Sequence, residues 1–151
     1  MALIDTHCHL DAAEFDADRE NVIQEALLSD VKMMVVPAVH RSNFEAVTQL
    51  AQSHSCCAHA LGIHPMYVST SQPEDLAFLE KETAKQIKSG HPPVAIGEIG
   101  LDFFIADYDK ALQEHYFVEQ LKIAKQYDLP VILHVRRAID DVLKQDKKAR
   151  N

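Results

Sequence analysis

The chain has 151 residues, of which 47% are hydrophobic and 25% are charged, and its formal net charge is −8 at pH 7. This length and composition are typical of one globular domain with a sizeable buried core. The negative charge argues against non-specific binding of DNA or RNA, which depends on neutralising phosphates, although a local basic rim or a metal ion could still receive a phosphate.

Strand-like and helix-like segments alternate along the whole chain. Continuous apolar runs indicate buried strands, and apolar residues at helical spacing indicate helices. Two capping boxes, Ser42 to Glu45 and Ser71 to Glu74, predict helix starts. In chain order we predict a strand at residues 2–4, a helix at 19–30, a strand at 31–36, a helix from 42, a strand at 58–63, a helix at 71–89, a strand at 94–97, a helix at 109–127, a strand at 131–133 and a helix from about 137.

These five strand–helix units predict an α/β fold with parallel strands joined by right-handed crossovers. Two architectures compete, a doubly wound open sheet and a (β/α)8 barrel. A barrel brings the C-terminal ends of all its strands to one mouth, whereas an open sheet spreads them along a line. Glycine-rich dinucleotide and phosphate-loop motifs are absent, and polar residues gather at the strand ends. The sequence therefore favours a TIM-type barrel, here a partial barrel of about five units, with these residues at its mouth: His7, His9, His64, Glu98 and His134.

His7 and His9 follow the first predicted strand directly. Side chains alternate faces along extended chain, so both imidazoles project from one face and Cys8 turns the other way. Two imidazoles close enough to share an ion form half of a metal site. A pair of ordinary surface histidines is the alternative interpretation.

Glu98 and His134 end two later strands. Glu98 is in phase with Val94 and Ile96, so an inward face would carry its carboxylate to the same mouth as the histidine pair. Taken alone, Glu98 could simply meet solvent at a strand end, and His134 could be a hydrogen-bonded residue of the core or rim. Joint placement of four such side chains at three strand ends points instead to Zn²⁺, Mn²⁺ or another divalent ion, and a Glu can bridge two ions about 3.5–4 Å apart.

Four ordered runs resemble the TatD family of metal-dependent hydrolases: IDTHCHLD at residues 4–11, GIHP at 62–65, GEIGLD at 97–102 and LPVILHVR at 129–136. The resemblance implies a TIM-type barrel and metal-dependent hydrolysis, often of phosphodiesters in DNA. It also implies one or two divalent ions (Zn²⁺, Mg²⁺ or Mn²⁺) as cofactors. Carried over by motif, the metal ligands are His7, His9, Glu98 and His134, and His64 is a residue of the mouth that contacts substrate phosphate.

The chain departs from the family at its C-terminal end. The family contributes a further His ligand and an Asp from later strands, whereas this chain passes from residues 1–143, the N-terminal part of such a barrel, into a polar tail at 144–151. We therefore expect a truncation. The absent Asp is the family's general base, so the catalytic residue is unknown. We expect this chain alone to have much weaker activity than a full-length relative, or none, and its unpaired outer strands to make it poorly soluble or oligomeric.

The leading interpretation is a hydrolase that cleaves phosphodiester (DNA) or related ester bonds with metal-activated water. One alternative is a catalytically inactive remnant that at most binds metal. Another is an amidohydrolase acting on a cyclic amide. A carboxylated Lys at the mouth would favour this alternative, but the sequence places Glu98 there. DNA or another phosphodiester is the expected partner, and neither a membrane nor a specific protein partner is inferred.

The remaining signals concern the cellular compartment and the residues that surround the proposed site. An odd number of cysteines, Cys8, Cys56 and Cys57, predicts no disulfide framework and indicates a reducing compartment. No signal pattern opens the chain and no apolar run approaches the roughly 20 residues of a membrane span. We therefore expect a cytoplasmic protein. Cys8 is expected to pack in the core. Asp102 is expected to lie on a loop, where it orients Glu98 or the loop itself, or caps a helix or a turn.

Overall fold

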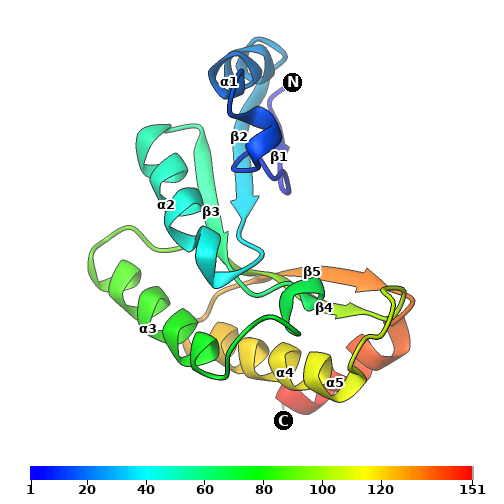
Figure 1. Ribbon diagram of the computed structural model, residues 1–151. Helices are drawn as coiled ribbons and strands as arrows, with labels where there is room; N and C mark the ends of the chain where they lie inside the picture. Colours follow the sequence, from blue (N-terminus) through cyan, green and yellow to red (C-terminus); the bar gives the residue numbers. More distant parts are fainter. Residues whose placement is uncertain (151) are drawn as a thin grey trace.

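Five parallel strands lie side by side in chain order in the computed structural model, which describes residues 1–150 (Figure 1). Each strand pairs in parallel with the next one along the chain, without the reversal of order that a doubly wound sheet requires. The prediction of a partial TIM-type barrel is therefore confirmed. The strands are β1 (Leu3–Asp5), β2 (Val31–Pro37), β3 (Cys57–Leu61), β4 (Ala95–Asp102) and β5 (Val131–Arg136).

Five α-helices follow the strands and lie along the outer side of the curved sheet (Figure 1). None of them, in the described part of the chain, combines the length and apolar character that crossing a membrane requires. The last helix continues past residue 143, so most of the predicted polar tail at 144–151 is helical. Asn151 lies outside the described residues. The helices are α1 (Arg19–Leu28), α2 (Phe44–Ser53), α3 (Glu74–Lys88), α4 (Lys110–Gln126) and α5 (Ile139–Arg150), and the 3₁₀ turns are η1 (Ala13–Phe15), η2 (Arg41–Asn43) and η3 (Pro65–Tyr67).

Neither predicted capping box forms. The Ser71 hydroxyl donates to the carbonyl oxygen of Tyr67 at 2.9 Å, so it belongs to the turn before α3 rather than to the helix. Ser42 lies inside η2, where its hydroxyl contacts Nδ1 of His40 at 3.0 Å. In both places the serine hydroxyl bonds within the turn that precedes the helix, and the α-helix begins two or three residues after the serine.

Two buried glutamines of α4 fix the strand ends that carry polar residues. The amide of Gln120 accepts from the backbone N–H of Ile63 at 2.7 Å and donates to its carbonyl at 3.1 Å. Gln113 makes the same pair of bonds with the backbone of Asp102, at 2.8 and 2.9 Å. Both glutamines are almost fully buried, so these bonds satisfy backbone groups that water cannot reach. The ends of β3 and β4 are thereby locked to one helix.

Candidate metal centre

Three of the predicted ligands converge on the inner side of the sheet. His7 and His9 follow β1, and the N–H group of Cys8 between them donates to the carbonyl of Val35 in β2 at 3.0 Å. The Nε2 atoms of the two histidines lie 3.0 and 3.4 Å from Oε2 of Glu98, and 3.3 Å from each other. One potential ligand atom from each residue therefore lies within 4.8 Å of the other two.

His134 faces the other oxygen of the same carboxylate. Its Nδ1 lies 3.1 Å from Oε1 of Glu98, because β5 pairs with β4 in a register that sets His134 beside Gly100. The two oxygens of Glu98 thus face separate imidazole groups, and a carboxylate so placed can bridge two ions. The structure brings all four predicted ligands together, and their nitrogen and oxygen donors fit a divalent cation.

Glu98 is 5% exposed and yet strongly acidic. Burial alone would raise the pKa of its carboxyl, but the hydrogen bond from His9 and the neighbouring imidazoles outweigh burial and lower the pKa to about 2. The same contact raises the pKa of His9, because Glu98 stabilises the protonated ring. At neutral pH the carboxylate is therefore ionised, which is the state that binds a metal.

Asp102 holds His134 from the opposite side. His134 lies between two carboxylates, with Nε2 2.9 Å from Oδ2 of Asp102 and Nδ1 3.1 Å from Oε1 of Glu98. A ring that donates from Nε2 to Asp102 would leave the lone pair of Nδ1 free to bind a metal ion beside Glu98. A carboxylate that accepts from a ligand histidine in this way fixes its tautomer and orientation. The expected loop position was wrong, because β4 extends to Asp102, which is fully buried and contacts His134 rather than Glu98. The expected turn cap is present, since Oδ1 of Asp102 accepts from the backbone N–H of Phe104 two residues further on.

Hydrogen bonds keep Asp102 ionised in this buried position. Burial raises the pKa of Asp102, but the backbone N–H of Phe104, which donates to Oδ1 at 2.9 Å, and the bond from His134 together bring the pKa below its ordinary value. Its two oxygens thus have distinct partners, one in the β4–α4 loop and one in β5.

His64 reaches the same cluster but differs from the others in its proton. Nδ1 of His64 accepts from the backbone N–H of Met66 at 3.1 Å, where it caps η3, so the single proton of the neutral ring must sit on Nε2. Burial lowers the pKa of His64 to about 4, which keeps it neutral at physiological pH. Although Nε2 lies 3.7 Å from Oε1 of Glu98, within ligand reach, it is a hydrogen-bond donor.

A hollow of about 360 Å³ adjoins the cluster between the loops that follow β1, β2 and β3, and its walls include His9, His64 and Tyr67. Asp11 also lines it, a residue that the sequence analysis did not single out. Oδ2 of Asp11 accepts from the amide of Asn43 at 2.7 Å, whereas Oδ1 is buried without a hydrogen-bond partner among the described residues. Its place at the end of the IDTHCHLD run, two residues after His9, was its signal in the sequence.

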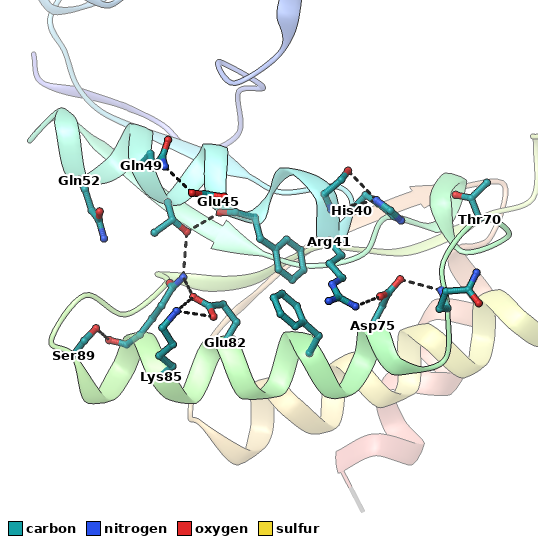
Figure 2. Close-up of a pocket in the computed structure, with 16 residues that line it drawn as sticks. His40, Arg41, Glu45, Gln49, Gln52, Thr70, Asp75, Glu82, Lys85 and Ser89 are labelled. Atoms are coloured by element: carbon teal, nitrogen blue, oxygen red, sulfur yellow. Dashed lines mark hydrogen bonds and ion pairs between the residues drawn. The ribbon is translucent and has the colours of Figure 1, made fainter.

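A larger hollow, of about 810 Å³, lies between α2 and α3 (Figure 2). Figure 2 shows Arg41 directed at Asp75, which it contacts at 2.9 Å, and the guanidinium lies 4.0 Å above the ring of Phe78. Its polar lining residues are largely bonded to one another, and none of the predicted site residues lines it. The chemistry predicted from the sequence is therefore confined to the inner side of the sheet.

The cysteines stay outside the ligand cluster. Cys8 packs against the core, and burial raises the pKa of its thiol to about 11, so it is protonated at neutral pH. All three cysteines are free thiols. The expectation that Cys8 packs in the core rather than beside His7 and His9 agrees with the structure.

Comparisons with known proteins point to one family. The family described as TatD related DNase matches residues 4–151. The chain is 41% identical over 137 residues to the uncharacterized metal-dependent hydrolase YjjV of Escherichia coli K12, covering 91% of this chain and 52% of that protein. It is 34% identical over 148 residues to the human deoxyribonuclease TATDN3, covering 91% and 53% of the two chains.

Solved structures agree with this match. The crystal structure of YjjV, a TatD homologue from E. coli K12, superposes with a TM-score of 0.90 at 39% identity, covering 97% of this chain and 56% of that one. A TatD family hydrolase from Entamoeba histolytica has a TM-score of 0.86 at 22% identity, covering 99% and 56%, which supports the fold alone. The chain spans about half the length of the relatives that it matches.

Proposed function

Because this chain belongs to the TatD family of metal-dependent hydrolases, we propose that His7, His9, Glu98 and His134 hold one or two divalent ions at a site for hydrolysis of phosphodiester bonds in DNA. One observation carries the proposal: the two carboxylate oxygens of Glu98 face different imidazoles. Oε2 lies 3.0 Å from Nε2 of His7, and Oε1 lies 3.1 Å from Nδ1 of His134. An ordinary buried ion pair has no need of three histidines around one carboxylate, whereas a metal centre does.

The ligand set is compatible with Zn²⁺, Mg²⁺ or Mn²⁺, since it combines imidazole nitrogens with a carboxylate. When bound, such ions polarise the phosphoryl group and acidify water. The residues of the chain fix where this happens: Glu98 is already ionised at neutral pH, and an Asp102 that accepts the Nε2 proton of His134 would leave Nδ1 of that ring free to bind the ion.

His64 is proposed to contact the substrate. Its Nε2–H is a neutral donor beside Glu98, and its ring forms part of the wall of the 360 Å³ hollow. A donor held in a buried position by the Met66 N–H group can bind a phosphoryl oxygen without rearrangement. The substrate would then approach from the hollow and place its phosphodiester between His64 and the histidine pair.

DNA as the substrate rests on the relatives, because TATDN3 is named a deoxyribonuclease. Other esters fit the same chemistry. The cyclic amide alternative has less support, since Glu98 stands at the mouth where a carboxylated Lys would have favoured it. Three free thiols support a reducing compartment, and we propose that the protein acts in the cytoplasm.

The direct test is cleavage of a short labelled DNA by the purified chain with Mg²⁺, Mn²⁺ or Zn²⁺, with E. coli YjjV assayed in parallel. We expect metal-dependent product at a lower rate than YjjV gives, and none from the His7→Ala/His9→Ala variant. Metal binding without cleavage under all three conditions would contradict the hydrolase proposal and favour a remnant that only binds metal.

A further inference from the structure

Two consecutive arginines share one aromatic ring at the edge of the metal centre. The guanidinium carbon of Arg136 lies 3.6 Å from the centre of the Phe104 ring, and that of Arg137 lies 4.4 Å from it. Arg136 ends β5 two residues after His134, and Phe104 follows the end of β4 by two residues. The arrangement therefore lies at the C-terminal ends of the two strands that carry Glu98 and His134.

The backbone makes this arrangement possible. Consecutive residues of a strand point to opposite faces, so two neighbouring side chains do not normally reach one ring. Arg137 has a φ of 54°, a left-handed conformation directly after the end of β5, and its guanidinium lies near the same ring as that of Arg136. The left-handed conformation is unfavourable for a non-glycine residue, and such residues often mark functional positions.

Hydrogen bonds tie the ring to the metal centre. The N–H group of Phe104 donates to Oδ1 of Asp102 at 2.9 Å, and Oδ2 of that carboxylate accepts from His134. The N–H group of Phe103 donates to the carbonyl of Arg136, also at 2.9 Å. These bonds hold the backbone of Arg136 and of Phe104 close to His134, so a ligand bound by the arginines would lie at the same mouth.

The charges of the two arginines are not compensated. Among the residues that the structure describes, neither guanidinium has a carboxylate oxygen within 4.0 Å. Lys110 is a useful contrast, because it lies 5.0 Å above the neighbouring Phe103 ring but pairs with Asp141 at 2.7 Å. Two cations without a carboxylate partner, on a chain of net charge −8, favour binding of an anionic ligand at this place.

We propose that Arg136 and Arg137 form a phosphate-binding subsite, which takes a phosphate of a nucleic acid strand next to the phosphodiester at the metal centre. The assignment of a nucleic acid rests on the proposed function. A guanidinium stacked by its face keeps its N–H edges available for two parallel bonds to phosphate oxygens. Phe104 is 46% exposed, and such aromatic surface beside cations also suits unpaired bases.

The test is binding of a fluorescein-labelled single-stranded oligo-dT, followed by fluorescence anisotropy in EDTA over a series of salt concentrations. Replacing both arginines by glutamine (Arg136→Gln/Arg137→Gln) is expected to weaken binding roughly tenfold at low salt and to reduce the slope of log affinity against log salt by at least about 0.7, the loss of one phosphate contact. Inorganic phosphate is expected to compete with the oligonucleotide more strongly than chloride at equal ionic strength.

Matched variants separate this subsite from general charge. Lys81→Gln removes one positive charge from the exposed surface of α3 and should leave binding nearly unchanged. Phe104→Leu keeps both charges and removes the ring, and we expect it to weaken binding; circular dichroism checks that each variant folds. A double glutamine variant that binds like wild type, or a wild type without measurable binding at low salt, would overturn the proposal. Because EDTA removes metal, a failure of cleavage leaves this result unaffected.

Discussion

Asp102 accepts a hydrogen bond from Nε2 of His134 at 2.9 Å, and this contact directs Nδ1 of His134 towards Glu98. The pair joins the last residue of β4 to β5, so the orientation of one proposed ligand depends on a buried carboxylate that touches no other ligand. Its role is positioning, because it acts through His134.

Asp102→Asn should weaken metal binding by about 10- to 100-fold, the usual effect of losing a carboxylate that orients a ligand histidine. An asparagine lacks the charge that holds the proton on Nε2. Zinc affinity can be measured by competition with a chromogenic chelator. Asp128→Asn is the matched control, since Asp128 has a φ of 53°, which asparagine tolerates, and lies outside the site. Equal zinc affinities for both variants would contradict this role.

Gly100→Ala should disrupt the contact between β4 and β5. The φ of Gly100 is 149°, and a Cβ atom there would collide with the carbonyl oxygen of His134. We expect the free energy of unfolding to fall by about 3 kcal/mol or more. Gly90→Ala separates backbone conformation from collision, because Gly90 has a φ of 80° but open space around it, and should cost about 1 kcal/mol. Urea denaturation of both variants measures the difference.

His59 should make the metal-free chain less stable in mild acid. Burial lowers the pKa of His59 below its ordinary value of 6.5, although its 2.7 Å bond to Gln86 partly opposes this shift. The unfolded chain therefore binds a proton at a higher pH than the folded chain does. Its stabilising contribution is complete above about pH 6.5 and is lost as the pH falls towards the folded pKa, by up to about 1.4 kcal/mol per pH unit.

The measurement compares the free energy of unfolding from about pH 7.5 to about pH 5 in EDTA. His59→Gln should show a shallower fall than wild type, whatever its absolute stability. His91→Gln changes an exposed histidine and should follow the wild-type curve. Parallel curves for wild type and His59→Gln would show that this residue does not contribute.

The outer strands should make the 151-residue chain self-associate. In the described structure β1 and β5 each pair on one side only, and they expose Ile4 to 64% and Leu133 to 43%. Size-exclusion chromatography with light scattering should detect oligomers that Ile4→Lys/Leu133→Lys reduces. Leu28→Lys changes an exposed leucine at a helix end and should have no effect. A monodisperse wild-type monomer would contradict this expectation.

Much of the fold followed from the sequence because strand and helix periods alternate cleanly. The positions of His7, His9, Glu98 and His134 were predictable, since parallel strands of a barrel bring their C-terminal ends to one mouth. Element boundaries were less accurate: β4 extends to Asp102 instead of ending at residue 97, because the pairing with β5 continues past Gly100. No local pattern in the sequence reports that pairing.

Backbone geometry in the turns after the strands accounts for the rest of the site. The tautomer of His64 depends on the Met66 N–H group in a turn whose geometry cannot be read from periodicity. The proximity of Arg137 to Phe104 depends on a left-handed backbone at a non-glycine residue, which local propensity disfavours.

The central claim is that His7, His9 and Glu98 hold a divalent ion, with His134 on the other side of Glu98. Diffraction from a crystal soaked in Zn²⁺, recorded at the zinc absorption edge, tests it most directly. The account predicts an anomalous peak about 2.1 Å from Nε2 of both His7 and His9 and from the nearer oxygen of Glu98. A peak bound elsewhere, with Glu98 still hydrogen-bonded to protonated His9, would contradict it.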